Sequence, residues 1–213
     1  MRACLDGLVT ALYVTIDDLL DQRTGPGRPP RLSDAELVTI AVAQVLLGCP
    51  TEHRWLRSCY GRLGHLFPYL PNQPGSNKRL RQAAPQLALV IRDLDVHTPT
   101  WREPIRLLDS TPLPCGTSRG TVRRSDVAEL GARLVRPDRA DEPRRLGRLG
   151  GIRQWVERII DTFKGQLSLE QHGARTVAGV FVRVAQRLLA LAAVPWFNWR
   201  IGQPGRHLTP YDH

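Results

Sequence analysis

The sequence predicts an α-rich α+β fold with two domains, a helical N-terminal region over residues 1–95 and an α/β domain over residues 101–213. Two observations support this division. Apolar residues recur at helical spacing through most of the first region, whereas short apolar runs that end at proline appear after Trp101. With 213 residues and a hydrophobic fraction of 42%, the chain can form one medium domain or two small ones with a packed core.

Start and stop signals divide the chain into elements. Ser33 and Glu36 form a capping-box pattern before an apolar run, and Gly48 and Pro50 end that run. The expected helices span residues 4–21, 37–47, 52–60, 77–94, 152–166 and 176–194. The expected strands span residues 104–108 and 132–135, each followed by turn residues.

The charge balance indicates a polyanionic partner. The chain has 30 basic and 20 acidic residues, a net charge of +10. Such an excess says little about fold but favours nucleic acid first and an anionic membrane second. The long apolar stretch 177–194 contains Arg183 and Arg187. Each arginine at the centre of a bilayer costs about 2.5–3.5 kcal/mol. We therefore expect an amphipathic core helix here and no membrane partner.

The cysteines and the N-terminus favour a cytoplasmic location. The four cysteines form no CxxC pair and the six histidines no HExxH pattern, which argues against zinc and fits a reducing compartment. Asp6 and Asp17 interrupt any apolar segment of the signal-peptide type. We therefore expect a cytoplasmic protein.

Two segments carry the candidate chemistry. Helix 152–166 places Arg153, Glu157 and Lys164 on the face opposite its apolar side chains, and Asp109 directly follows the strand 104–108. Each feature alone has an ordinary structural explanation. The charged face can form i,i+4 ion pairs of a few tenths of a kcal/mol, and an aspartate before Ser-Thr-Pro is typical of a turn.

Together, the two segments resemble the DDE-type insertion-sequence transposases of bacteria. The run Ile105-Arg-Leu-Leu-Asp-Ser-Thr-Pro112 resembles the strand with the first catalytic aspartate. Arg153, Glu157 and Lys164 match the spacing of the family's Tyr–Arg–Glu–Lys signature, although Gly150 stands where that signature has tyrosine. Further segments that resemble the family are 77–80, 121–126, 161–167, 169–172 and 208–213.

The resemblance implies an RNase H-like domain that cleaves and joins double-stranded DNA at the element's ends and its target. In that family three carboxylates hold two Mg²⁺ ions, which stabilise the attacking and leaving oxygens. Asp109 would be the first catalytic metal ligand and Glu157 the last, while Arg153 and Lys164 would face phosphates. The family pairs two DNA ends, so a functional form would be a homodimer.

The second catalytic aspartate is missing. Only 47 residues, 110–156, separate Asp109 from Glu157. The RNase H-like core needs two further antiparallel strands, a crossover helix, the aspartate strand, another helix and a fifth strand there, which is roughly twice the residues available. The remaining segments match the two ends of that region, so we infer an internal deletion near residues 128–131. The aspartates inside the gap lack a strand of their own or lie in a basic loop. They are Asp126, Asp138 and Asp141.

Three hypotheses about function remain open. The first is a transposase by ancestry with impaired strand cleavage. The second is a non-catalytic protein that binds the element's ends and competes with intact transposase. Its binding residues would be the cations of the helical region, Arg54, Arg57, Arg62, Lys78, Arg79 and Arg81. The third is a non-functional remnant that folds poorly because its sheet is incomplete.

Overall fold

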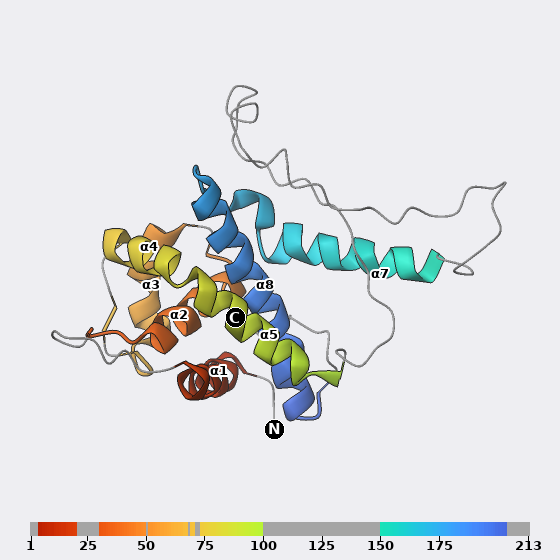
Figure 1. The fold of residues 1–213 in the computed structure, drawn as a ribbon, viewed down its shortest axis with the longest axis horizontal. Coiled ribbons are helices and arrows are strands. Elements are labelled where there is room, and N and C mark those ends of the chain that lie inside the picture. Colours follow the sequence, from red (N-terminus) through yellow and green to blue (C-terminus); the bar gives the residue numbers. More distant parts are fainter. Residues whose placement is uncertain are drawn as a thin grey trace.

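Seven α-helices and no strand form in the part of the chain that the computed structural model describes, residues 4–20, 30–49, 51–67, 69–70, 73–99 and 150–203 (Figure 1). In chain order they are α1 (Leu5–Leu19), α2 (Asp34–Leu46), α3 (Glu52–Leu63), α4 (Gln73–Gln82), α5 (Ala84–Val96), α7 (Gly150–Asp161) and α8 (Val177–Arg200). The α-rich character is therefore confirmed. The two expected strands lie outside the described residues.

Helix α2 is the central helix of the bundle. The expected capping box is present: Ser33 Oγ accepts from the Glu36 amide at 3.0 Å, and Glu36 Oε2 accepts from the Ser33 amide at 2.6 Å. Eleven of the thirteen residues of α2 are buried, as expected for a helix covered on all sides. Gly48 follows the helix with a φ of +61°, a left-handed conformation that glycine adopts without strain.

The expected single helix over 77–94 is wrong, because the structure has two helices there. Helix α4 ends at Gln82 and α5 begins at Ala84. The reason is Pro85, which lies in the first turn of α5. Proline has no amide hydrogen to bond to the carbonyl of Arg81, and its ring clashes with that carbonyl in a continuous helix. The proline starts a new helix instead.

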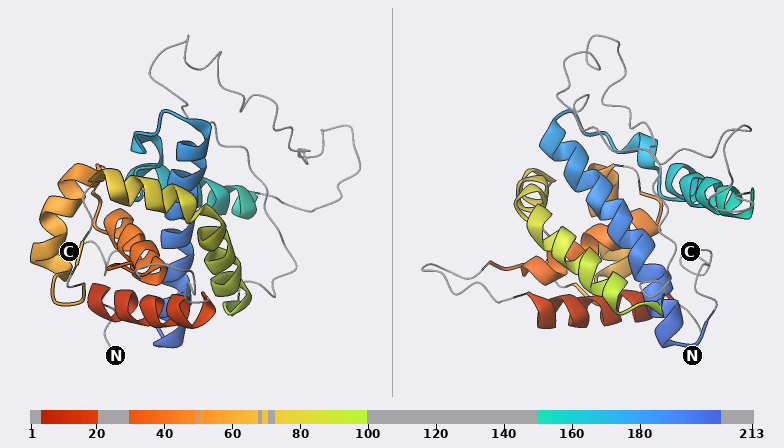
Figure 2. Two further views of the ribbon diagram at one scale, coloured as in Figure 1. Left: turned by 60° about the vertical axis from the view of Figure 1, so that its left-hand side comes forward. Right: turned by 45° about the vertical axis from the view of Figure 1, so that its right-hand side comes forward.

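Helix α8 is longer than the sequence suggests. It continues through Pro195 to Arg200, because Trp196 and Phe197 are buried in the core on the turn beyond the proline. By length and composition α8 is the one helix of the described residues that could cross a membrane, which is weak support for a membrane protein. Here α8 packs against α2 and α5 (Figure 2).

The described helices share one hydrophobic core. Leu189, Ala193 and Val194 of α8, which belongs to the expected second domain, are fully buried. They lie in the same apolar cluster as the buried residues of α1, α2 and α5 from the expected first domain. The C-terminal helix therefore completes the core of the N-terminal helical region.

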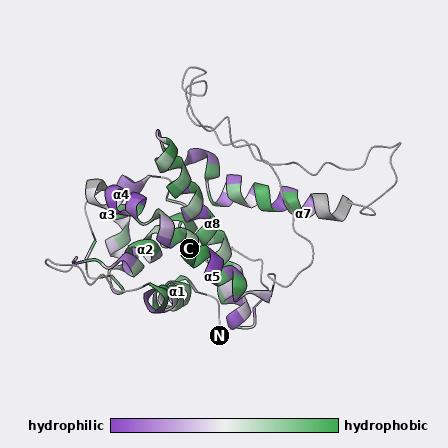
Figure 3. Cartoon of the chain, in the orientation of Figure 1, coloured by the Kyte–Doolittle hydropathy of each residue, from purple (hydrophilic) through white to green (hydrophobic). Residues whose placement is uncertain are grey.

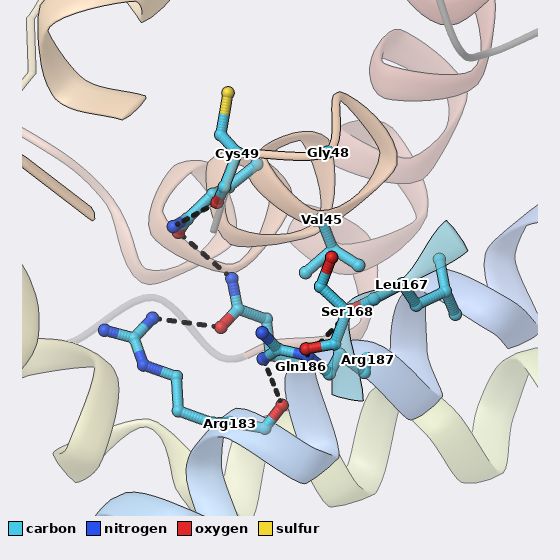
Figure 4. A pocket seen from close by; sticks show the side chains of 9 residues that line it. Val45, Gly48, Cys49, Leu167, Ser168, Arg183, Gln186 and Arg187 are labelled. Carbon is cyan, nitrogen blue, oxygen red and sulfur yellow. Dashed lines mark hydrogen bonds between the residues drawn. The ribbon is translucent and has the colours of Figure 1, made fainter. Parts of the chain in front are cut away.

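A polar network crosses this core on one face of α8 (Figure 4). Arg183 donates to Glu52 Oε2 of α3 at 3.2 Å and to Asn77 Oδ1 of α4 at 2.8 Å. Gln186, 1% exposed, donates to Ala41 O of α2 at 2.6 Å and to Gln44 Oε1 at 3.2 Å. Side chains from two successive turns of α8 thus hold three other helices.

Arg183→Met tests how much this network contributes to the free energy of unfolding. The substitution leaves the Glu52 carboxylate, whose side chain is 4% exposed, without its cation. Breaking a buried ion pair costs about 3–5 kcal/mol, and we expect about 3 kcal/mol less free energy of unfolding in urea. Arg175→Met, at an exposed arginine before α8, is the control and should change it by less than about 0.5 kcal/mol. A loss below about 1 kcal/mol for Arg183→Met would contradict the assignment.

Candidate functional site

A basic surface lies on α3 and α4, which pack against each other. Its exposed cations, called the α3–α4 basic surface below, are Arg54, Arg57, Arg62, Lys78 and Arg81. Glu52 is the sole acidic residue in the sequence from 51 to 83, and it is buried against Arg183. Helix α4 is accordingly coloured mostly hydrophilic in Figure 3. The surface therefore presents positive charge with no acidic side chain of α3 or α4 to offset it.

Arg79, the third expected DNA-binding residue of α4, has partners within the fold. Its Nη2 donates to Asp34 Oδ1 at 2.7 Å, and its Nη1 donates to the carbonyl of Leu32 at 2.8 Å. The side chain is 24% exposed and only half-buried, whereas Lys78 and Arg81 are exposed. Arg79 thus joins α4 to the N-terminal end of α2, where Asp34 also lies favourably in the helix dipole.

The expected catalytic residues are described only in part. Glu157 is exposed on α7, on the expected helix, which continues as a π-helical segment, η3 (Thr162–Gln166). Asp109 and the side chain of Arg153 lie outside the described residues. Among the residues that the structure describes, no three His, Cys, Asp or Glu side chains are placed to hold a metal ion.

Lys164 of η3 forms a surface ion pair. Its Nζ lies 3.1 Å from Glu170 Oε1, and both side chains are well exposed, 38% and 49%. Such a pair contributes little to stability, because solvent screens it. A phosphate can therefore displace Glu170 at modest cost, so the pair does not remove Lys164 from the candidate site.

The described cysteines differ in exposure, and Cys59 is buried. Burial raises the pKa of the Cys59 thiol to about 12, and the nearby Cys49 adds to the effect. A metal needs the thiolate, which this environment disfavours. Cys4 is exposed at the start of α1, where its Sγ accepts from the Gly7 amide at 3.3 Å.

The residues that sequence reasoning missed are the polar side chains of α8. Arg183, Gln186 and Arg187 stand at helical spacing within an apolar stretch, and they were interpreted only as an obstacle to membrane insertion. Their spacing puts them on one face of the helix, which is the available signal for a buried polar network. The partners cannot be identified from spacing, since Glu52 lies 131 residues away.

Hollows of different size adjoin α8 in the described part of the chain. A cavity of about 10 Å³, room for roughly one water molecule, lies between Gln44, Ser168 and Arg187 (Figure 4). A larger open pocket of about 470 Å³ lies where α5 and α8 end, and it is lined by His97, Trp199 and Arg200 among others. Neither contains a residue of the expected catalytic set.

Comparisons with protein-family models, with curated proteins and with solved structures find no match to this chain. The likeness to DDE transposases therefore depends on the motifs in the sequence alone. The geometry adds the exposed α3–α4 basic surface and the position of Glu157 on α7.

Arg79→Met separates a structural role from DNA contact at this position. Removing the guanidinium deletes its hydrogen bonds to Asp34 Oδ1 and to the Leu32 carbonyl, so we expect about 1–2 kcal/mol less free energy of unfolding in urea. Lys78→Met, at the exposed neighbouring cation, is the matched control and should change stability by less than about 0.5 kcal/mol. Equal free energies of unfolding for the two variants would show that the Arg79 contacts contribute nothing to stability.

Proposed function

We propose that the chain derives from a bacterial insertion-sequence transposase and binds the double-stranded ends of its element through the α3–α4 basic surface, with strand cleavage impaired by the missing second aspartate. The observation that carries the proposal is the exposure of five cations on two helices that pack against each other, with no acidic side chain of the same helices to offset them. Cations that neutralise phosphates release counterions, and this supplies most of the affinity of a protein for DNA.

The scaffold behind the surface supports this function. Arg183 bonds to Glu52 at the start of α3 and to Asn77 on α4, so one side chain fixes both basic helices relative to each other. A fixed spacing of cations favours the regular phosphate positions of a duplex, since phosphate contacts set the register of a protein on DNA. The helices need no rearrangement to present their charges together.

The metal centre is incomplete. Mg²⁺ prefers carboxylate oxygens together with water and phosphate, and the DDE reaction uses three carboxylates for two ions. Glu157 is the one expected ligand among the described residues, and the sequence supplies only Asp109 as a second. Two carboxylates do not fit a two-ion centre, so we derive no cleavage step from them.

The second candidate function follows from the same surface. A chain that binds the element's ends without cutting them occupies sites that an intact transposase requires. It would then act as a competitor of transposition. The incomplete carboxylate set favours this function over active cleavage, and the two functions make opposite predictions about nicking.

Salt dependence of DNA binding tests the basic surface. The logarithm of the binding constant falls with the logarithm of salt by about 0.9 per phosphate contacted, so five contacts give a slope of about −4.5. Lys78→Ala/Arg81→Ala should weaken binding to end DNA in gel-shift assays and reduce the slope by about 2 units.

Arg92→Ala is the control for this experiment, because it removes an exposed arginine from α5, outside the α3–α4 basic surface. We expect its slope to equal that of the parent chain. A loss of affinity in Arg92→Ala half as large as in the double variant, on a logarithmic scale, would indicate nonspecific attraction by net charge. Undiminished binding by the double variant would place the DNA elsewhere.

A cleavage assay on labelled element-end DNA tests the metal centre. With Mg²⁺ or Mn²⁺ we expect no nicking by the parent chain and none by Glu157→Ala, because the carboxylate set lacks its middle member. Nicking that disappears in Glu157→Ala would mean that another residue replaces the second aspartate, and the proposal of impaired cleavage would be wrong.

A further inference from the structure

Arg187 on α8 clamps the turn that follows η3. Its Nε donates to the carbonyls of Leu167 and Ser168 at 2.9 and 3.2 Å, and its Nη1 donates to the carbonyl of Arg183 at 3.0 Å. The residue is 4% exposed, and in the described part of the chain its recorded partners are carbonyl oxygens and no carboxylate. The charged guanidinium of Arg187 is therefore buried with three hydrogen bonds to backbone carbonyls as its observed contacts.

The clamped carbonyls belong to Leu167, the residue that ends η3, and to Ser168, whose carbonyl also accepts from the Gln171 amide at 3.0 Å. The last carbonyls of a helix have no amide to accept from and carry the negative end of its dipole. Here the chain also changes direction, because Ser168 has a φ of +50°, a left-handed conformation unusual for serine. Arg187 thus satisfies the end of η3 and fixes the turn at the point where the direction is set.

Burial disfavours the charged form of Arg187, because the guanidinium loses its contacts with water. Desolvation, with a smaller contribution from Arg183, lowers the pKa of Arg187 to about 10. An apolar side chain at this position would avoid the penalty, but it would remove the side-chain donor to the Leu167 carbonyl and leave Ser168 only the bond from the Gln171 amide. The arginine provides directional contacts to one turn, which general packing does not provide.

Helix α7 depends on this turn for its direction. Figures 1 and 2 show α7 projecting beyond the bundle and joined to it at its C-terminal end through η3. The apolar anchors next to the turn are Leu167 and Leu169, which are 3% and 6% exposed. By contrast Ile159, in the last turn of α7, is 46% exposed. Phe163 of η3 packs partly buried against the core, so the attachment is concentrated in residues 163–172.

The same face of α8 also holds the basic helices. Arg183 lies one turn before Arg187 and binds Glu52 of α3 and Asn77 of α4. The Arg187 guanidinium in turn bonds to the Arg183 carbonyl. Two consecutive turns of α8 therefore connect the α3–α4 basic surface to the turn from which α7 extends.

We propose that Arg187 is a positioning residue, whose clamp on the carbonyls of Leu167 and Ser168 sets the direction of the Glu157-bearing helix α7 relative to the α3–α4 basic surface. The part of this inference that concerns DNA rests on the proposed function. With DNA bound on α3 and α4, the clamp brings α7 to the duplex in one orientation.

Amide hydrogen exchange tests the clamp on the full chain without DNA. In Arg187→Met the amides of Leu167 and Gln171, which bond within the turn, should exchange at least tenfold faster, while those of α2 stay protected. Arg187→Lys, which keeps the charge but lacks the planar fork, should give the same local loss. Arg200→Met, at an exposed arginine of α8, should change nothing in the turn. Unchanged exchange in the turn, or equal loss throughout α2, would overturn the proposal.

A photo-crosslinking amino acid at Gln154, an exposed position on α7, tests the orientation. With end DNA we expect crosslinks in the Arg187 chain and at least a fivefold lower yield in Arg187→Lys, at an unchanged gel-shift Kd. Equal yields would overturn the orienting role. If no chain shifts the DNA, the proposed function fails, while the exchange experiment still decides whether the clamp exists.

Discussion

The described fold depends on one contact, the buried contact of Arg183 with Glu52 and Asn77. It joins the last long helix to α3 and α4, and it gives the Glu52 carboxylate the cation that its burial requires. Because the same α8 packs against α2 and α5, the apolar core and the polar network stabilise one arrangement together. The basic helices keep their charges outward because their single acid is neutralised inside.

This arrangement links the two parts of the candidate site. Lys78 and Arg81 extend outward from α4, and Glu157 lies on α7, which leaves the bundle at the turn that Arg187 holds. In the proposed function, DNA binding needs only the first part. Cleavage of the DDE type would need both parts and three carboxylates, of which the sequence supplies only Asp109 and Glu157. A chain with the first part intact and the second incomplete can still occupy DNA.

Local signals predicted most of the helices, and long-range contacts explain what was missed. The capping box of Ser33 and Glu36 is present because both partners lie within four residues. The break before α5 was missed because Pro85 stands in an otherwise helical pattern. The cations Lys78 and Arg81 were expected on the surface and lie there, whereas the partner of Arg79 lies 45 residues away and could not be foreseen. Asp109 and the expected strands lie outside the described residues, so the catalytic half of the site stays a prediction.

Mapping the face of the protein that contacts element-end DNA is the most direct test of this account. We would compare amide exchange of the full chain with and without the duplex at low salt. The account predicts slower exchange in α3 and α4, with α1 and α5 unchanged and the effect lost at high salt. Protection confined to α1 or α5, or no protection anywhere with the DNA bound, would contradict it.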